Sequence, residues 1–512
     1  MVGSEAPVQR QYRVHKNPVS NGYIAELDTG KLIRLSERLG AYLLGESPAN
    51  ERVLITAERI GLSPAGKVDT LPPPSGPRLH VHSPLKIQYD LVRSGDDARW
   101  FRQMSRLLNP TILFGGSAIL LVSGPLSVLL RDDSPWTALW SPINYFLFVL
   151  LIPGILVTTV VHEFAHAVTL RRFGRGPNRA GVMFYLMAPA GFCDISPVWM
   201  LPRAQRLAVC LAGVACHLGL AGSSFLVGTV THGDLRQLFD LFGLFVGLTG
   251  LFNLIPFVKF DGYLALVAWM DAPFLQAHSS GLVSQGLARA IVKGEGLPSA
   301  LSRKSLFGVM CVATPPLIIG FTTVRLFSIF SAMGGLGRIL LALLLLLIIV
   351  LLGQLVAKIA SSMRSLGANG IQFAIYYLTV AVVVLLFLFL PIDLRGSGGF
   401  HRTESNSSTV ELAFSPSAAS HGLPESVQLE KRGLWRKSIA KATVHPAEAH
   451  ECMVERMSLT PFYTNGLHGM TRMTCVSATA SDLPEMSEGL MSFNRGEVPM
   501  WKFLYDSLFG KA

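Results

Sequence analysis

Charged residues are scarce in this sequence: Asp, Glu, Lys and Arg make up 15% of 512 residues, whereas 50% are hydrophobic. That balance is typical of a membrane protein. The sequence has no Walker-type phosphate loop and no Gly-rich dinucleotide fingerprint, so neither an ATP-driven pump nor a dinucleotide enzyme is indicated. We also expect no signal peptide, because the first hundred residues are polar and mixed. We therefore expect the N-terminal domain to stay in the cytoplasm.

The charges that are present are mostly positive, and the formal net charge is +11. In a membrane protein, an excess of Lys and Arg marks cytoplasmic loops, so we do not expect nucleic acid as a partner. Arg171, Arg172 and Arg175 directly follow a long apolar run. The positive-inside rule places this cluster, like the N-terminus, on the cytoplasmic side.

Long apolar runs occupy much of the rest of the chain. A membrane-spanning helix needs about 20 apolar residues, and seven segments come near that length. We therefore expect a multi-pass protein of the cell membrane, with the lipid bilayer as a partner and the C-terminal tail outside. The expected spans are residues 110–130, 144–168, 207–230, 238–257, 306–330, 338–360 and 371–392.

The second of these runs ends in the motif H-E-x-x-H, at residues 162–166. On a helix, His162 and His166 lie on the same face, where two neutral imidazoles can hold Zn²⁺ together. Glu163 beside them can act as general base toward a water that zinc activates. The alternative is a helix end whose polar residues meet water. Ionisable residues beside a long apolar run are costly and usually functional, which favours the zinc site.

A hydrolytic zinc site needs a third protein ligand and an open position for water. Asp261 is the best candidate, because Pro256 breaks the preceding helix and lets the chain turn back. The alternative for Asp261 is an ordinary Asp-Gly turn at a membrane exit. His217 is the residue that could supply a fourth ligand, and a site with four protein ligands would be structural rather than catalytic.

The two ends of the chain lack long apolar runs. Residues 1–70 are expected to form a small α/β domain, with a hairpin over residues 23–35 and a helix capped by Ser36. Residues 71–109 are expected to contain a Pro-rich linker, at 71–77, and a juxtamembrane amphipathic helix. That helix either lies on an anionic membrane face or packs on the soluble domain.

Residues 180–200 are too short, and too interrupted by Gly and Pro, to cross a membrane. Non-helical backbone at membrane depth is tolerated where it lines a cavity. We therefore predict a re-entrant segment that could hold an extended substrate by main-chain hydrogen bonds. An interfacial loop is the alternative.

Residues 393–512 are expected to form a soluble C-terminal tail that begins with a Ser-rich linker, residues 405–420. No C-x-x-C pair occurs in the sequence, which argues against a zinc finger or a thioredoxin-like motif. Cys452 and Cys475 can form a disulfide only if the tail faces an oxidising compartment. The tail has further candidate metal ligands, but their irregular spacing does not favour a cluster: His445 and His450 with Cys452.

Two of these motifs together resemble the site-2 protease family of intramembrane zinc metalloproteases. They are H-E-x-x-H in one span and N-x-x-P-x(4)-D-G, at residues 253–262, at the end of a later one. Residues 206–217 are similar to the family's R-x-x-x-x-x-A-G-P-x-x-N segment and depart from it at Val214 and His217. The resemblance covers about residues 144–265.

The resemblance implies an assignment for each site residue. His162, His166 and Asp261 would bind zinc, and Glu163 would be the general base. Asn253 would face the active site and hydrogen-bond the substrate. The family's known ligands lie outside the segment that departs from its pattern, so that departure leaves these assignments unchanged.

A narrower resemblance concerns the substrate. Residues 185–196, followed by Trp199, resemble a branch of peptide zinc metalloproteases that often accompany the synthesis of ribosomally made, modified peptides. Residues 1–70 resemble PqqD-like leader-peptide recognition domains, in which a hairpin precedes helices and a strand edge can accept a peptide.

The sequence therefore predicts an all-α polytopic membrane protein with about 6–8 transmembrane helices and a site-2-protease-like core. Residues 110–392 would form this zinc protease domain, behind a small α/β cytoplasmic N-terminal domain. The predicted activity is zinc-dependent hydrolysis of a peptide bond in or beside the membrane, in a peptide or membrane-protein substrate. One expected role is the maturation of a ribosomally made, modified peptide. One alternative is regulated intramembrane proteolysis of a membrane-bound signalling protein. Another is a non-enzymatic scaffold or peptide-export component with a structural zinc site.

Overall fold

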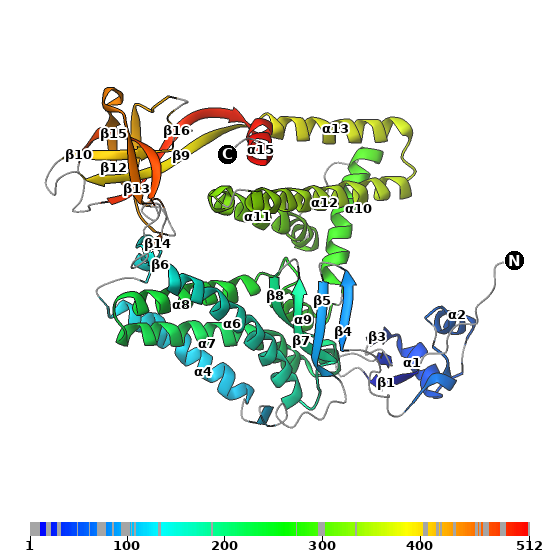
Figure 1. Ribbon diagram of the computed structural model, residues 1–512. Coiled ribbons are helices and arrows are strands. Elements are labelled where there is room, and N and C mark those ends of the chain that lie inside the picture. Colours follow the sequence, from blue (N-terminus) through cyan, green and yellow to red (C-terminus); the bar gives the residue numbers. More distant parts are fainter. Residues whose placement is uncertain are drawn as a thin grey trace. The chain divides into compact units, whose positions relative to one another are not determined.

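The computed structural model divides the chain into two compact units, residues 1–135 with 149–273 and residues 136–148 with 274–512 (Figure 1). It describes residues 11–509 except for 17–21, 28–31, 49, 61, 69–77, 84–85, 94–102, 104, 107–108, 132–134, 186–187, 273, 295–302, 333–334, 403–407, 416–418, 420–421, 434–436, 456–458, 460–461, 464–469 and 482–487. The Pro-rich linker and most of the expected amphipathic helix lie outside the described residues.

The first unit begins with a small α/β domain. Its elements are β1 (Tyr12–Lys16), β2 (Tyr23–Leu27), β3 (Leu32–Leu35), α1 (Glu37–Leu44), α2 (Glu51–Arg59) and the 3-10 turn η1 (Pro64–Gly66). The strands form an antiparallel sheet in the order β1-β2-β3. Ser36 caps α1 by accepting a hydrogen bond from the backbone N–H of Leu39. The predicted hairpin and helix cap are therefore confirmed, and the domain has its own buried apolar core.

A four-stranded antiparallel sheet follows, in the order β4-β5-β7-β8. Its strands are β4 (Leu79–Ser83), β5 (Lys86–Arg93), β7 (Arg179–Tyr185) and β8 (Ala188–Cys193). The sheet changes two expectations. Residues 71–109 are more than a linker and a helix, since they supply two strands. Residues 180–200 begin with a β-hairpin, because β7 and β8 pair with each other and β7 also pairs with β5.

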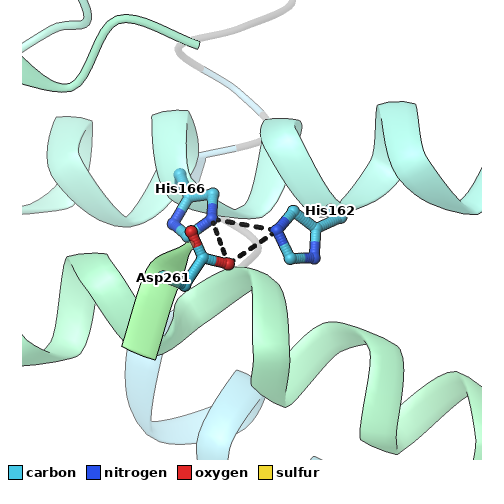
Figure 2. Close-up of side chains that lie close together, drawn as sticks. All are labelled: His162, His166 and Asp261. Atoms are coloured by element: carbon cyan, nitrogen blue, oxygen red, sulfur yellow. Dashed lines mark hydrogen bonds and ion pairs between the residues drawn. The ribbon is translucent and has the colours of Figure 1, made fainter. Parts of the chain in front are cut away.

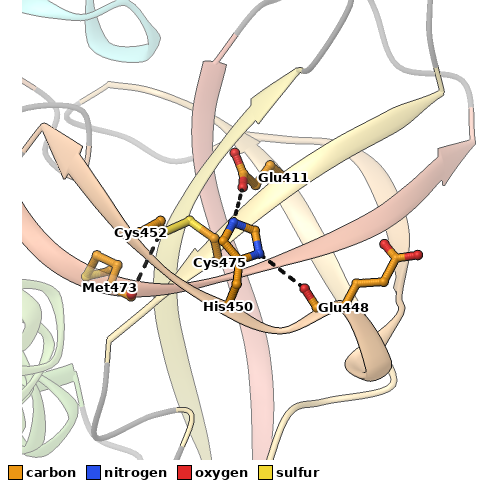
Figure 3. Close-up of a disulfide and its surroundings, with 6 residues drawn as sticks. All are labelled: Glu411, Glu448, His450, Cys452, Met473 and Cys475. Atoms are coloured by element: carbon orange, nitrogen blue, oxygen red, sulfur yellow. Dashed lines mark hydrogen bonds and ion pairs between the residues drawn. A yellow bond between two sulfur atoms is a disulfide. The ribbon is translucent and has the colours of Figure 1, made fainter.

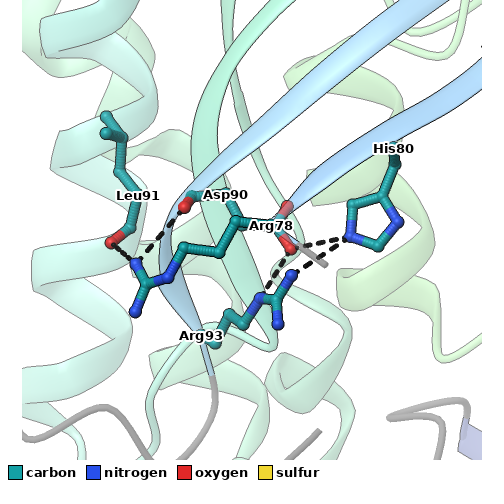
Figure 4. Close-up of polar contacts among 5 residues, drawn as sticks. All are labelled: Arg78, His80, Asp90, Leu91 and Arg93. Atoms are coloured by element: carbon teal, nitrogen blue, oxygen red, sulfur yellow. Dashed lines mark hydrogen bonds and ion pairs between the residues drawn. The ribbon is translucent and has the colours of Figure 1, made fainter. Parts of the chain in front are cut away.

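A buried carboxylate joins β4 to β5 (Figure 4). Asp90 is fully buried, and its Oδ2 lies 3.0 Å from Nε2 of His80 and 2.9 Å from Nε of Arg93. Arg78 donates a 3.1 Å hydrogen bond to the carbonyl oxygen of Leu91, at the point where the β5–β7 register shifts. A buried charge is tolerated when it is paired in this way, so the cluster stabilises the hairpin that supports β7.

Helices make up the rest of the first unit: α4 (Pro110–Leu129), most of α6 (Tyr145–Arg172), α7 (Arg203–Val230), α8 (Gly233–Asn253) and α9 (Asp261–Met270). Helices α4 and α7 approach closely through small residues. A Cβ added to Gly124 would lie 2.6 Å from the Cα of Gly222, and one on Gly219 would lie 2.7 Å from Oγ of Ser117. Small residues at such positions are typical of helix pairs in membranes.

The second unit contains a helical part: α10 (Leu275–Lys293), α11 (Arg303–Ala332), α12 (Gly335–Ser365) and α13 (Gly370–Leu388). Each of the seven expected spans falls on a helix. Among the described residues, six helices are long and apolar enough to cross a membrane, namely α4, α6, α7, α8, α12 and α13. The described apolar part of α11 is shorter, residues 305–321. The protein is thus of the multi-pass membrane class.

The C-terminal region is a β-barrel, which makes the all-α prediction wrong for this part of the chain. Its strands are β9 (Pro391–Arg402), β10 (Thr409–Phe414), β11 (Ser426–Lys431), β12 (Lys437–Val444), β13 (His450–Glu455), β15 (Met470–Ser481) and β16 (Glu488–Pro499). Six strands close in the order β10-β9-β16-β11-β12-β15, because β15 also pairs with β10, and β13 adds to β15. Strand β10 lies within the expected Ser-rich linker. Buried apolar side chains fill the barrel.

A disulfide between Cys452 and Cys475 joins β13 to β15 (Figure 3). Beyond the barrel, the two-residue strand β14 (Phe462–Tyr463) pairs in parallel with β6 (Ile143–Asn144), the two residues directly before α6. The last described element, α15 (Met500–Phe509), follows β16. The backbone N–H of Met500 bonds the carbonyl of Leu390, where α13 gives way to β9.

Candidate metal centre

Three side chains from two helices converge at one point in the first unit (Figure 2). His162 and His166 lie one turn apart on α6, and Asp261 is the first residue of α9. The Oδ2 atom of Asp261 lies 2.8 Å from Nε2 of His162 and 3.3 Å from Nε2 of His166. The two ring nitrogens are 3.2 Å apart. The structure thus brings together the three ligands that the sequence predicts.

A tight turn returns Asp261 to the histidines. Helix α8 ends at Asn253, and Phe260 is extended before α9 begins. A Cβ on Gly262 would lie 2.2 Å from the carbonyl oxygen of Leu254, so the chain can close this turn only with glycine at that position. This explains physically why the Asp in the motif is followed by Gly.

The donor set fits a cation. Nδ1 of His166 lies 2.7 Å from the carbonyl oxygen of Val209 and must carry a proton, because a carbonyl only accepts. In the neutral ring, Nε2 is then a lone pair that faces the Asp261 carboxylate. Oδ2 of Asp261 is buried and has no aligned hydrogen-bond donor. Electron lone pairs that converge on one buried point repel one another unless a cation lies between them, and a bound metal ion supplies that cation.

Asp261 is ionised at neutral pH in this arrangement. Its burial opposes ionisation, but the adjacent His162 and His166 side chains outweigh burial and hold the pKa of Asp261 well below its usual range. Two imidazoles and one carboxylate form a three-ligand set that suits zinc and leaves one tetrahedral position for water.

Glu163 lies beside the metal ligands, half-buried on α6, and the N–H of Cys193 on β8 bonds its carboxylate. Strand β8 packs closely against helix α6 at Gly191. A Cβ on Gly191 would lie 3.0 Å from both Cγ of Glu163 and Cα of Val160. The hairpin that the sequence analysis called re-entrant therefore supports the side chain that is expected to act as general base.

Gly213 is a site residue that the sequence analysis missed. A Cβ at this position would lie 2.4 Å from Nε2 of His162 and 2.5 Å from Nε2 of His166. Only glycine lets α7 approach the two rings so closely. The signal that could have found it is the A-G pair of residues 212–213, within the segment that resembles the family's pattern.

Other candidate residues do not join the cluster. Asn253, the last residue of α8, is half-buried, and the part of the chain that the structure describes shows no hydrogen bond from it to the clustered side chains. His217 is buried, but its Nε2 lies 3.2 Å from the carbonyl of Thr158 and not among the metal-facing atoms. In the barrel, Cys452 is disulfide-bonded and therefore unavailable as a thiolate ligand.

The fold and this cluster define a multi-pass membrane protein in which two buried histidines meet a partly buried aspartate. The chain is 28% identical over 129 residues to the "Putative peptide zinc metalloprotease protein YydH" of Bacillus subtilis, covering 24% of this chain and 49% of that protein. It is 34% identical over 153 residues to the "Putative zinc metalloprotease Rip2" of Mycobacterium tuberculosis, covering 23% and 56%. The chain spans about half the length of these relatives.

No protein-family model and no solved structure matches the chain. The curated similarities are partial and low in identity, and they support a relationship to zinc metalloproteases. Both relatives' names specify zinc, in agreement with the two-imidazole, one-carboxylate ligand set.

Proposed function

We propose that this protein is an intramembrane zinc metalloendopeptidase that hydrolyses a peptide bond in or beside the bilayer. One observation carries the proposal: two histidines of an apolar helix meet a carboxylate from a second helix, with a glutamate directly beside them. A detergent-purified, zinc-loaded enzyme should cleave a membrane-peptide substrate, lose this activity to a zinc chelator and regain it when zinc is added back.

The residues divide the chemistry between them. Zinc held by His162, His166 and Asp261 would supply a nucleophilic water at neutral pH and polarise the scissile carbonyl. Glu163 accepts the proton of that water and later delivers a proton to the leaving amine. The N–H of Cys193 orients the Glu163 carboxylate for both transfers. Packing by Gly191 and Gly213 leaves little freedom to either the base or the ligands.

Two observations favour this reading over the alternatives. A structural zinc site has four protein ligands, whereas the described residues here bring three together. Regulated proteolysis by related enzymes is associated with an inserted PDZ-like domain. Between α6 and α9, the described chain contains the β7–β8 hairpin, a 3-10 turn, the helices α7 and α8 and short connections, with no further domain among these residues. A substrate such as a ribosomally made, modified peptide is therefore our preferred proposal.

The barrel supplies an argument for membrane orientation. Strand β14 pairs with β6 directly before α6 begins, whereas Arg171 and Arg172 end that helix. If α6 crosses the membrane, as we propose, the chain at its start and the arginines at its end would lie on opposite faces of the bilayer. A disulfide also requires an oxidising compartment. We therefore propose a cytoplasmic N-terminus and an external barrel, which needs an odd number of crossings and makes α11 the seventh span.

Labelling in intact cells tests this orientation. A membrane-impermeant maleimide should label an exposed E448C variant of the barrel in intact cells. It should label an exposed R38C variant of the N-terminal domain only after the membrane is permeabilised. Each variant is compared with the unaltered chain, which sets the background from native cysteines. Labelling of both variants in intact cells, or of neither, would show that the two domains share one side.

Substrate selection is proposed for the N-terminal domain. Strand β3 is the last strand of its sheet, and β8 is the last strand of the sheet beside Glu163. An extended peptide could add to such an edge by main-chain hydrogen bonds. Arg34 on β3 forms a 3.0 Å ion pair with Asp271, directly after the helix that begins with Asp261. The recognition domain is thus linked to the helix that carries a metal ligand.

Deleting residues 1–70 should raise KM for the natural peptide and leave cleavage of a short generic substrate nearly unchanged. The reason is that the deletion removes the β3 edge but no residue of the metal centre. Asp271 also forms a 2.8 Å ion pair with Arg206, which the deletion does not remove. Steady-state kinetics on both substrates measure the effect, and R34A separates loss of the ion pair from loss of the domain. Equal KM values for the truncated and full chains would rule out recognition by this domain.

A further inference from the structure

One face of α7 contacts both metal-facing histidines. Val209, Gly213 and His217 are spaced four residues apart, so they lie on the same face of that helix. The carbonyl of Val209 accepts from His166, Gly213 leaves room for both rings, and His217 lies against His162. The earlier histidine of α6, His162, meets the later position of α7, His217, and His166 meets the earlier position, Val209. Each candidate ligand histidine therefore has its own neighbour on α7.

His217 has a hydrogen-bond acceptor that is unused. The side chain is buried, with 1% exposure. Its Nε2 must carry the proton, because it lies 3.2 Å from the carbonyl oxygen of Thr158, which only accepts. In the neutral ring, Nδ1 is therefore unprotonated and can accept a hydrogen bond. This buried Nδ1 has no hydrogen-bond partner.

His162 has the complementary donor. Its Nε2 faces the Asp261 carboxylate, and an imidazole that ligates a metal through Nε2 keeps its proton on Nδ1. The Nδ1 atom of His162 is also buried and has no hydrogen-bond partner. His166 differs, because its Nδ1–H already donates to the carbonyl of Val209. One metal-facing ring is therefore oriented by a hydrogen bond, and the other has an unused donor beside an unused acceptor.

We propose that His217 is a positioning residue that accepts a hydrogen bond from Nδ1–H of His162 when zinc is bound, an inference that rests on the proposed zinc site. The two rings are neighbours, with centroids 4.4 Å apart at an interplanar angle of 41°, and the bond would form when zinc binding reorients them. Such a bond fixes the ring of a ligand histidine and raises its basicity toward the metal. His217 stays outside the ligand set, so the open position for water remains.

Two amide substitutions separate the nitrogens of His217. In H217N, the amide oxygen can occupy the place of Nδ1 and still accept from His162. In H217Q, the amide nitrogen can reach the place of Nε2 and still donate to Thr158, but no acceptor remains near His162. Zinc affinity, measured by competition with a chelator on the detergent-purified full chain, should stay within a few-fold of the unaltered protein in H217N. It should fall by about 10–100-fold in H217Q.

Each other outcome overturns the inference. Equal loss in both variants would make His217 a ligand or a general packing residue, and no loss in either would leave it without a role at the metal. Loss in H217N alone would assign the role to Nε2. If H162A keeps full zinc, the proposed site itself is wrong, which separates failure of the function from failure of this inference.

The unaltered chain offers a second measurement if a variant fails to fold. With ¹⁵N-labelled histidine, zinc addition should produce a coupling between two histidine ring nitrogens across one N–H···N hydrogen bond. H162A identifies the signal by removing it. A zinc-saturated protein without this coupling would contradict the inference.

Discussion

Replacing Glu163 by Gln should abolish peptide cleavage while zinc binding and the fold are retained. Gln has nearly the same shape as Glu and can keep the hydrogen bond from the N–H of Cys193 through its amide oxygen. It cannot accept and deliver a proton. Loss of a general base typically lowers turnover by roughly 10²–10⁴-fold. Steady-state kinetics on the zinc-loaded E163Q enzyme measure this effect.

A matched control separates chemistry from charge. E26Q removes a partly buried carboxylate that pairs with His15 in the N-terminal domain, away from the metal centre. It should leave cleavage of a short generic substrate unchanged. Turnover in E163Q close to that of the unaltered enzyme, with zinc content equal in both, would remove Glu163 from the mechanism.

Replacing Gly213 by Ala should be nearly as damaging, although it adds only one methyl group. That methyl would lie within 2.5 Å of the Nε2 atoms of both His162 and His166. Since nothing real packs so closely, the ligand rings or α7 must move. Misplacement of reacting groups by about 1 Å can cost on the order of 10²-fold in activity. We therefore expect G213A to lose zinc affinity and cleavage together, measured by chelator competition and kinetics.

Gly353 provides the control for this substitution. It lies on the apolar helix α12, and an added Cβ would meet no atom within 4 Å. G353A should therefore bind zinc and cleave substrate as the unaltered enzyme does. Normal zinc affinity in G213A would show that the close approach of α7 to the histidines is not needed for the site.

The helical part of the fold was predictable because its signal is local. A run of about 20 apolar residues is dictated by the thickness of the bilayer, and each expected span falls on a helix. The capping of α1 by Ser36 was readable for the same reason, since a capping side chain bonds backbone only three residues away. The two metal-facing histidines could be paired because helical spacing alone places them on one face.

The four-stranded sheet and the barrel were not predictable because many of their strand partners are distant in sequence. Strand β5 pairs with β7, about ninety residues away, and β9 pairs with β16 at a similar separation. Residues 393–512 show no strong hydrophobic period that would mark their strands. The disulfide closes a pairing of β13 with β15 that only the folded barrel reveals.

The site itself was predictable in its ligands but not in its surroundings. Motif spacing indicates which residues are candidate ligands, whereas the close contacts at Gly213 and Gly191 depend on the distance between packed elements. The hydrogen bond from Cys193 to Glu163 likewise joins a strand to a helix that no local pattern connects. Only the packed structure shows these supporting contacts.

Zinc content per chain tests the central claim most directly. Elemental analysis of the detergent-purified full chain should give close to one zinc per molecule, because His162, His166 and Asp261 form one convergent ligand set. The double variant H162A, D261A should contain almost none, since only one ligand remains. Full zinc retention in the double variant, under conditions where it stays folded, would contradict the proposed site.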